Sequence, residues 1–482
     1  MISSNHLINS DFRFKINELW LQFLWKSNVF EKENLFTTNG QSLKVIFPGW
    51  FNDSWGPDFK ESRIIIGNTS YFGDVELHID ESAWHQHSHH TNNSYNKVIL
   101  HVFLNKSKLS AMNTFGQTIP SLCLKSDFLT GFWKSLSSKT NLNEGELPGA
   151  CGLSLNDRSF KRLKSIIQQA AEARLITKSQ KFMKILKKGD QTLAEDILFS
   201  SICKSLGYGA HAEQMEAISQ IYPYSYLRSY FITPQRQNRK EILSRWFGYL
   251  RVFDKADINQ MHEDLRREWL GLDQHWRQLG EKRQTSKTNS QVPYRPYNNP
   301  VRRLVGLHYH LQSVRFKGLL GSWLRFLKRC KTDIHSKKGK SRFLRALDKM
   351  FPQPSWDPFS YFNPPLGKTN PQLHSRFIGR QKQLVVFVNS IIPFFLAWSR
   401  IHHEKELEKI LFRLLLILPS EGKNRKIRFM ENRLFIGNDT YRMKNSLGYG
   451  QGLIQIHDDS CTCFYEGCRR CSLLNWLRST DT

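Results

Sequence analysis

The sequence predicts an α+β protein: a mixed sheet near the N-terminus, then a mainly α-helical region, and a cluster of cysteines at the C-terminus. Apolar and polar residues alternate between Phe51 and Phe103, which is typical of strands. After about Arg158 the apolar residues recur at helical spacing. We therefore expect an α/β domain, a helical domain, a basic helical domain and a cysteine-rich metal-binding tail, over residues 1–145, 146–280, 295–455 and 456–482.

The first predicted elements are a helix over residues 12–28 and a short strand over Ser42–Phe47. Glu18 lies off the apolar stripe of this helix, so it is either an exposed glutamate or a residue that faces a site. A β-hairpin follows, because the strand-like run Ile64–Ile66 precedes the alternating run around Val75–Ile79 across a turn-rich gap of hairpin length at residues 67–70.

One face of this hairpin carries ionisable side chains, and the apolar residues lie on the other face. Successive side chains of a strand point to opposite faces, so Glu76 and His78 share one face, and the hairpin brings Asp58 near them. Oxygen-rich clusters hold hard cations such as Mg²⁺, and a nitrogen ligand widens the choice toward Mn²⁺ or Zn²⁺. An exposed strand face shows the same alternation, so a purely structural interpretation stays open.

Histidines crowd the polar connection that leads from the hairpin to the next predicted strand, Lys97–Leu104. If three of them converge on one point, they form a metal site of a different type. Isolated histidines beside Asn and Ser are also common in solvated loops. The candidate ligands of such a histidine-rich site are His78, His85, His87, His89 and His101.

The formal net charge of +28 predicts a strong positive potential. Polyanions are the natural partners, nucleic acid first, with an anionic membrane surface as the alternative. Residues 1–20 are polar and resemble no signal peptide. The longest apolar stretch, Leu384–Trp398, is interrupted by polar residues and Pro393, so we expect a buried helix or a strand–turn–helix and no transmembrane segment. These features predict a cytoplasmic protein.

A linker at 141–149 precedes the helical region. From Arg158 onward most segments are predicted to be helices, interrupted by a polar loop at 280–294 and a Pro-rich irregular stretch at 352–370. We expect helices over residues 163–173, 193–206, 239–253, 384–402 and 404–418.

The segment Arg315–Lys349 is the most basic part of the chain. Its cations alternate with aromatic residues, Phe316, Trp323, Phe326 and Phe343, a mixture that can neutralise phosphates and stack on bases. An amphipathic helix with a solvated basic face would give the same pattern. The predicted nucleic-acid-binding residues are Arg325, Lys328, Arg329, Lys331, Lys337, Lys338, Lys340 and Arg342.

Four cysteines, Cys461, Cys463, Cys468 and Cys471, lie within eleven residues. The Cys-x-x-Cys spacing of the last two is usual for zinc. All four could bind one zinc ion, or three of them could join a distant cysteine such as Cys151 around an iron–sulfur cluster. In either case the metal would tie down the C-terminus.

Several motifs resemble those of an uncharacterised bacterial family known only as a domain of unknown function. They are GPDF at 56–59, GDVELH at 73–78, the Trp84–His89 segment, RPYNNPVRRL at 295–304, VNSIIPF at 388–394, GQGLIQIH at 450–457 and the final cysteines. The resemblance covers nearly the whole chain, and it implies no activity.

The N-terminal region is also similar to the restriction-endonuclease-like core of the PD-(D/E)xK nucleases. This resemblance implies that Asp58 and Glu76 hold Mg²⁺ or Mn²⁺, and that Glu18 matches a glutamate of the first helix. His78 stands where the family has lysine, which leaves Lys60 or Lys97 as candidates for the missing charge and leaves room for an inactive fold. Some of these nucleases hold an iron–sulfur cluster with one early and three late cysteines.

The leading prediction is a metal-dependent nuclease, in which a metal on Asp58 and Glu76 activates a water and His78 assists. Two alternatives remain: a non-catalytic nucleic-acid-binding protein with a degenerate nuclease fold, and a histidine-rich metal-dependent hydrolase acting on another substrate. The nuclease needs the two carboxylates within about 5 Å. The hydrolase needs three histidines that converge on a point.

Overall fold

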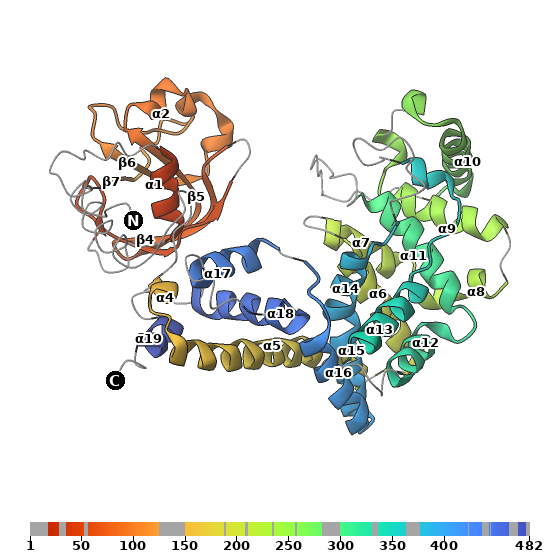
Figure 1. Ribbon diagram of the computed structural model, residues 1–482. Helices are drawn as coiled ribbons and strands as arrows, with labels where there is room; N and C mark the ends of the chain where they lie inside the picture. Colours follow the sequence, from red (N-terminus) through yellow and green to blue (C-terminus); the bar gives the residue numbers. More distant parts are fainter. Residues whose placement is uncertain are drawn as a thin grey trace, which may run out of the picture. The chain divides into compact units, whose positions relative to one another are not determined.

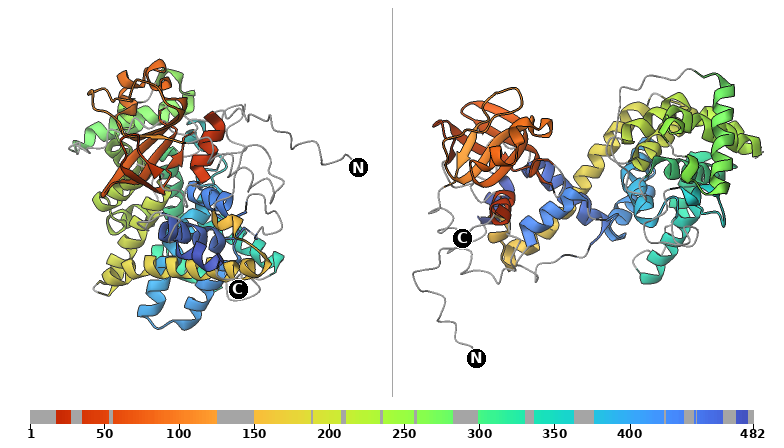
Figure 2. Two further views of the ribbon diagram at one scale, coloured as in Figure 1. Left: turned by 90° about the vertical axis from the view of Figure 1, so that its left-hand side faces the viewer. Right: turned by 90° about the horizontal axis from the view of Figure 1, so that it is seen from above.

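The computed structural model describes residues 18–27, 35–52, 56–124, 150–187, 189–207, 211–233, 236–255, 258–281, 299–329, 336–362, 376–422, 424–435, 443, 445–461 and 471–478. The chain divides into two compact units. Unit 1 comprises residues 1–170, 423–444 and 452–482, and unit 2 comprises residues 171–422 and 445–451. Figure 2 shows that the strands are confined to the N-terminal part of the chain.

The α+β class is confirmed, and the sheet of unit 1 is mixed (Figure 1). Its order is β1-β2-β4-β5-β6-β7, with β3 paired to β4. The pairs β5–β6 and β6–β7 are parallel and the remaining pairs are antiparallel. The strands are β1 (Leu35–Phe36), β2 (Ser42–Phe47), β3 (Trp50–Phe51), β4 (Phe59–Ile66), β5 (Thr69–Asp80), β6 (Val98–Asn105) and β7 (Ser121–Cys123).

The predicted hairpin is β4–β5, and its turn is shorter than expected. Ile66 pairs with Thr69, so only Gly67 and Asn68 form the turn, with Gly67 at a φ of +58°. Such two-residue turns need positive φ, which glycine adopts without strain. The expected element order of helix, strand, hairpin, connection and strand is therefore present.

A crossover of residues 81–97 joins the parallel strands β5 and β6, because parallel neighbours cannot be joined by a tight turn. It contains three short helical segments, α2 (Ala83–Gln86), η2 (His89–Thr91) and η3 (Asn93–Tyr95). Trp84 and Tyr95 of the crossover are buried with Val98, Ala111 and Ile119 in a small apolar cluster. This cluster holds the histidine-rich connection over the end of the sheet.

Helix α1 (Glu18–Ser27) packs on the sheet through Leu21, Leu24 and Trp25, which share one apolar core with β4, β5 and β6 (Figure 1). The Trp25 indole also donates a hydrogen bond to the carbonyl of Pro48 (2.9 Å). As a result the N-terminal turn of α1, with Glu18 and Gln22, lies close to Asp58.

The other helices of unit 1 come from both ends of the chain: α4 (Ala150–Leu153), the first part of α5 (Asp157–Leu186), α17 (Arg425–Phe435), the end of α18 (Leu447–Ile456), the π-helix η11 (His457–Cys461) and α19 (Ser472–Arg478). His457 stacks on Trp50 at 5.1 Å between ring centroids, and Phe47 and Phe429 meet the same two rings edge-on. These contacts attach the C-terminal segment to the sheet.

Unit 2 is helical. It contains the rest of α5 with α6 (Gln191–Leu206), α7 (His211–Ile221), α8 (Tyr224–Ile232), α9 (Arg236–Tyr249), α10 (Glu263–Leu279), α11 (Pro300–Val314), α12 (Gly318–Lys328), α13 (Lys337–Met350), α14 (Arg380–Val386), α15 (Ile392–Ile401) and α16 (Lys405–Ile417), and short helices η4 (Phe253–Lys255), η5 (Ile258–Gln260) and η8 (Pro358–Tyr361). The predicted helices are present, but the one expected over 239–253 ends at Tyr249 and is followed by the separate short helix η4. The predicted linker at 141–149 and most of the loop at 280–294 lie outside the described residues.

The RPYNNPVRRL motif has a structural role in the part that the structure describes. Asn299 caps α11 by accepting a hydrogen bond from the Val301 amide (2.9 Å). Arg302 is buried, and its Nη1 donates to the carbonyls of Phe359, Ser360 and Phe362 at 3.2–3.3 Å. This arginine therefore fixes the segment around η8, whose carbonyls would otherwise be buried without donors.

Two further motifs meet in a polar network inside unit 2. Lys178 of α5 donates to Asn389 (2.6 Å), in the VNSIIPF motif, and to Gln451 (2.9 Å), in the GQGLIQIH motif. Gln451 in turn donates to Glu421 (2.7 Å). Asn389 lies in a π-helical turn, η9 (Phe387–Ile391), which joins α14 and α15 into one helix. The network accounts for the polar residues in these otherwise apolar segments.

The helix Arg380–Ile401 is long and apolar enough to cross a membrane by composition, with a mean hydropathy of 1.8 over its best window. However, 72% of that window is buried inside the fold, as in the core helix of a globular protein. A helix here agrees with the first of the two expectations for Leu384–Trp398, and the strand–turn–helix alternative is wrong.

Gly452 offers a test of the packing in unit 1. A Cβ on Gly452 would lie 2.1 Å from the Ile167 carbonyl of α5, whereas one on Gly271 in α10 would meet nothing within 4 Å. We expect Gly452→Ala to destabilise the protein by about 1–3 kcal/mol through overpacking. The control, Gly271→Ala, should be stabilising by roughly 0.5–1 kcal/mol because alanine is the better helix former. Thermal unfolding measures both, and equal melting temperatures would contradict the packing argument.

Candidate functional site

Asp58 and Glu76 hold each other in place at the point where β4 begins. The first residue of β4, Phe59, pairs with Val75, so β5 continues past the end of its neighbour. There the Leu77 amide donates to Asp58 Oδ2 (3.1 Å) and the Asp58 amide donates to Glu76 Oε2 (2.9 Å). The two side chains replace the missing strand hydrogen bonds, which fixes the positions of both carboxylates.

The two carboxylates have different surroundings. Asp58 Oδ1 accepts a hydrogen bond from Gln22 Nε2 of α1 (2.7 Å), so both Asp58 oxygens are engaged. Glu76 keeps Oε1 for the histidines: this atom lies 3.3 Å from His89 Nε2 and 3.6 Å from His78 Nε2. Glu76 is therefore the carboxylate that faces the imidazole cluster.

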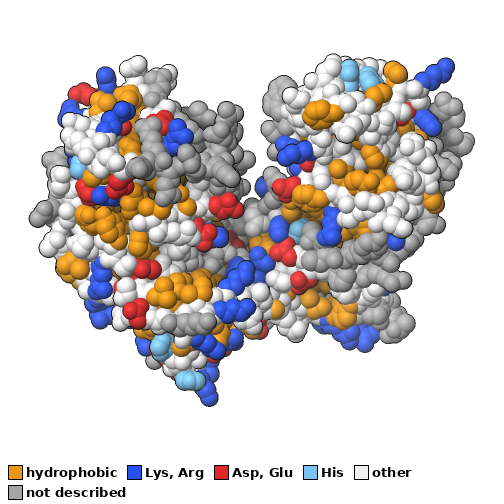
Figure 3. All heavy atoms as spheres, turned by 180° about the vertical axis from the view of Figure 1, so that it is seen from behind, with side chains coloured by type: hydrophobic (Ala, Val, Ile, Leu, Met, Phe, Trp, Pro, Cys, Tyr) orange, Lys and Arg blue, Asp and Glu red, His pale blue; other side chains and the backbone are white. Residues whose placement is uncertain are grey.

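Three histidines converge beside Glu76. His78 comes from β5, His87 follows α2, and His89 begins η2. Their ligand atoms all lie within 4.8 Å of one another, a separation that one metal ion can span. His78 and His89 are buried and His87 is exposed, so the cluster is accessible from solvent. In Figure 3, histidine side chains (pale blue) are visible at the surface around α2.

The neighbours of His78 and His89 fix the orientation of the rings. His78 Nδ1 lies 2.9 Å from Nε2 of His101, which is fully buried on β6. The His89 ring stacks on Tyr95 with 3.8 Å between ring centroids. These contacts leave His78 Nε2 directed toward Glu76 and His89.

Several nitrogen atoms of the cluster are buried without a hydrogen-bond partner among the residues that the structure describes. They are His78 Nε2 and both ring nitrogens of His89. Leaving a buried polar atom unpaired costs roughly 1–3 kcal/mol, so such atoms call for an explanation. Metal ligation would supply the missing partner, because a neutral imidazole nitrogen is a preferred ligand of Zn²⁺ and Mn²⁺.

Burial sets the protonation of the site. It raises the pKa of Asp58 to about 8, with the negative charge of Glu76 adding to the effect. Burial likewise raises the pKa of Glu76 to about 8, and Glu18 adds to the rise. Burial and the neighbouring histidines lower the pKa of His78 to about 2. His78 is thus neutral, as a metal ligand must be, and a metal ion would supply positive charge beside the two carboxylates.

Glu18 interacts electrostatically with the cluster. Burial raises its pKa, while the His87 and His89 imidazoles lower it. Lys60 and Lys97, the candidates for the charge of the missing lysine, instead interact with Asp74. His78 is therefore the residue at the position where the resemblance leads one to expect lysine.

The structure brings together the four predicted catalytic residues, Asp58, Glu76, His78 and Glu18. It adds Gln22, which the sequence analysis missed. Gln22 lies four residues after Glu18 and so on the same face of α1, a spacing that could have indicated it. Of the candidates for a histidine-rich site, His85 does not belong to the group of three; its Nε2 is bonded to the carbonyl of Ser110 (3.0 Å).

The predicted cysteine site can be followed only in part, because Cys463 and Cys468 lie outside the described residues. Cys461 Sγ lies 3.7 Å from Met430 Sδ, and Cys471 is buried at the start of α19. Cys151 is buried on α4, which contacts both α17 and α19. Zinc or an iron–sulfur cluster at these cysteines stays a prediction.

The basic segment has an amphipathic form. Arg325, Lys328, Arg329, Lys337, Lys338 and Arg342 are exposed and Lys340 is half-buried, while Lys331 lies outside the described residues. The expected stacking of bases on Trp323, Phe326 and Phe343 is wrong, because these rings pack in the core with at most 8% of their surface exposed. Helical periodicity turns them inward and the cations outward. Phe316 is 77% exposed.

A family model described as "Protein of unknown function (DUF2851)" matches residues 18–424. No curated protein and no solved structure matches the chain.

The raised pKa of Glu76 predicts a pH-dependent stability in the absence of metal. Its folded pKa of about 8 exceeds the unfolded value, so the folded state holds a proton that the unfolded state releases. Glu76 should therefore lower stability between pH 6.5 and 8 by about 1 kcal/mol per pH unit, and Asp58, whose pKa is also about 8, should add to the fall. Glu76→Gln should reduce this slope in urea denaturation with chelator present. Asp80→Asn, at an exposed position of the same strand, is the control. An unchanged slope in Glu76→Gln would contradict the assignment.

Proposed function

Because the chain belongs to the DUF2851 family, whose description names no activity, we propose from the geometry of its own site that it is a metal-dependent nuclease. The observation that carries the proposal is the convergence of His78, His87 and His89 with Glu76 Oε1. In this proposal the reaction takes place in the cytoplasm, and the substrate is a nucleic acid.

The donor set favours particular metals. Three imidazole nitrogens and one carboxylate oxygen suit Mn²⁺ or Zn²⁺ better than Mg²⁺, which prefers oxygen ligands. Glu76, His78, His87 and His89 would hold the ion. A metal ion bound there would lower the pKa of a coordinated water and offset charge on the scissile phosphate.

The remaining residues have distinct roles in this proposal. Asp58 acts as a positioning residue, since its carboxylate oxygens are engaged by Gln22 and the Leu77 amide while its own amide fixes Glu76. Glu18 has no positioning role in this proposal, and its carboxylate interacts electrostatically with His87 and His89. We assign it the general base, because burial moves its pKa toward the working pH, where proton transfer is most effective.

Nucleic acid is favoured as the substrate by charge. The chain has a formal net charge of +28, and α12 and α13 present exposed lysine and arginine side chains. Such a surface attracts phosphates and gives binding that weakens steeply with salt. The second candidate is a metal-dependent hydrolase of another substrate, which the convergence of the three histidines supports equally well.

The test uses the full chain with labelled single- and double-stranded DNA and RNA, in the presence of Mn²⁺, Zn²⁺ or Mg²⁺. We expect metal-dependent cleavage that Glu76→Gln and His89→Gln each reduce by at least about 100-fold, since each removes a ligand. The matched control is His85→Gln, which alters a histidine of the same crossover outside the converging group. Salt-sensitive binding without cleavage would favour the non-catalytic protein. Metal binding without activity on any nucleic acid would favour the other hydrolase.

His101 provides a separate check on the metal centre. If His78 binds metal through Nε2, its Nδ1–H donates to His101 Nε2, 2.9 Å away, and this contact fixes the ring. We expect His101→Phe to weaken Mn²⁺ or Zn²⁺ binding by roughly 10–100-fold, as for other partners of metal-bound histidines. His101→Gln, which retains an acceptor, should weaken it less. Calorimetric titration measures both, and wild-type affinity in His101→Phe would exclude the positioning role.

A further inference from the structure

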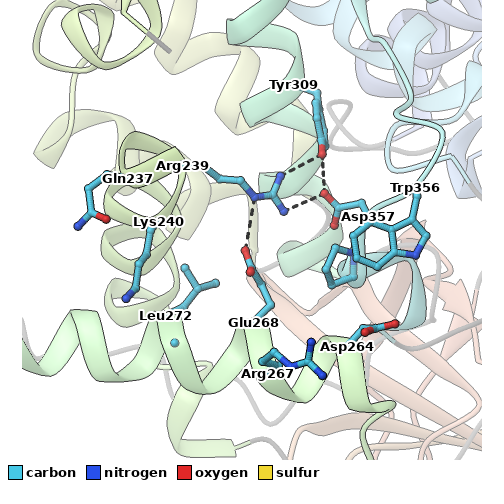
Figure 4. Close-up of a pocket in the computed structure, with 12 residues that line it drawn as sticks. Gln237, Arg239, Lys240, Asp264, Arg267, Glu268, Leu272, Tyr309, Trp356 and Asp357 are labelled. Carbon is cyan, nitrogen blue, oxygen red and sulfur yellow. Dashed lines mark hydrogen bonds and ion pairs between the residues drawn. The ribbon is translucent and has the colours of Figure 1, made fainter. Parts of the chain in front are cut away.

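Unit 2 contains a pocket of about 590 Å³ between α9, α10, α11 and the segment that precedes η8 (Figure 4). This volume lies within the range of small-ligand sites, roughly 300–1,000 Å³. The pocket belongs to unit 2 alone, so it is separate from the metal centre of unit 1.

The wall of the pocket is built around Arg239. Its guanidinium pairs with Asp357 (2.8 Å) and lies 3.5 Å from Glu268, and its Nη1 donates to the Tyr309 hydroxyl (3.0 Å). Tyr309 donates in turn to Asp357 (2.5 Å), whose other oxygen accepts from the Phe359 amide (2.8 Å). The network fixes these side chains before any ligand arrives, and Figure 4 shows its interactions among Arg239, Glu268, Tyr309 and Asp357 as dashed lines.

Two cationic side chains that line the pocket take no part in this network. Lys240 lines the pocket and has no ion-pair partner among the residues that the structure describes. Arg267 pairs with Glu263 (2.9 Å), but both side chains are more than 70% exposed, and Glu263 is not part of the pocket. An exposed ion pair of this kind contributes little, so Arg267 can exchange its partner for a ligand phosphate.

An aromatic ring and carboxylates complete the lining. The indole of Trp356 is 50% exposed, so its ring is available for contact with a planar ligand. Figure 4 shows it across the pocket from Lys240, with Arg239 between them. Asp264 and Glu268 add hydrogen-bond acceptors. A ligand that suits this lining has a flat ring with N–H donors at one end and negative charge at the other.

We propose that this pocket binds a single nucleotide whose base carries an amino group. Trp356 stacks on the base, Asp264 or Glu268 accepts from its amino group, and Lys240 and Arg267 contact the phosphate. The bound nucleotide is either a free nucleotide or the terminal nucleotide of a nucleic-acid strand. The proposal goes beyond the nuclease and does not depend on the metal centre.

Calorimetric titration of the full chain with AMP, CMP and UMP tests the proposal, in parallel with a linear single-stranded oligonucleotide and a covalently closed circle of the same composition. We expect AMP or CMP to bind with a Kd on the order of 1 mM or tighter, and UMP more weakly. Binding of the linear strand but of neither free nucleotides nor the circle would assign the pocket to strand ends.

Trp356→Ala should weaken binding at least about 5-fold, which corresponds to the loss of about 1 kcal/mol of stacking. Phe316→Ala, at another exposed aromatic of unit 2, should leave it unchanged. Lys240→Gln should weaken binding and reduce its salt dependence, whereas Lys409→Gln, on the exposed face of α16, should not. Glu76→Gln should bind nucleotides normally, which separates this proposal from the nuclease.

The proposal is overturned if no nucleotide or oligonucleotide binds, or if Trp356→Ala and Phe316→Ala behave alike. It is also overturned if no free nucleotide binds and Trp356→Ala leaves binding of the linear strand unchanged, since oligonucleotide binding then belongs to the basic surface of α12 and α13 and not to the pocket.

Discussion

The exchange of backbone and carboxylate hydrogen bonds between Asp58 and Glu76 is the constraint on which the site depends. Asp58, the residue directly before β4, supplies the acceptor for the Leu77 amide, and Glu76 accepts a hydrogen bond from the Asp58 amide. One consequence is that neither carboxylate can turn away without leaving a backbone amide without this acceptor. A second is that Glu76 Oε1 is held toward the histidines.

This arrangement costs stability without a bound cation. Two carboxylates and several neutral imidazoles are buried together, and burial moves each pKa against the charged form. Natural proteins keep such clusters mainly where function requires them. The pocket of unit 2 differs in this respect, because its buried Asp357 is compensated by Arg239 and by hydrogen bonds.

Local patterns predicted the strands β2, β4, β5 and β6 and the carboxylate pair because these depend on short-range rules, whereas the short strands β1, β3 and β7 were not predicted. Alternation identified β5, and the turn placed Asp58 beside Glu76. The histidine convergence could not be predicted in the same way, since it depends on how the crossover folds back over the parallel pair β5–β6. Composition also misled at α12 and α13, where Trp323 and Phe343 looked available for stacking but fill the core. The cation-rich pattern correctly indicated an exposed face on these helices, but it gave no information on whether their aromatic rings were accessible.

The order of the units along the chain affects how the protein is made. Unit 2 lies within unit 1 in sequence, and His457 packs on Trp50 although most of the chain separates them. The sheet of unit 1 is synthesised before unit 2, yet α17 and α19, which also belong to unit 1, are synthesised after most of unit 2. The helices of unit 2 from α6 to α16 are complete before α17 begins. A truncation after α16 would thus damage unit 1, which contains the sheet, while sparing most of unit 2.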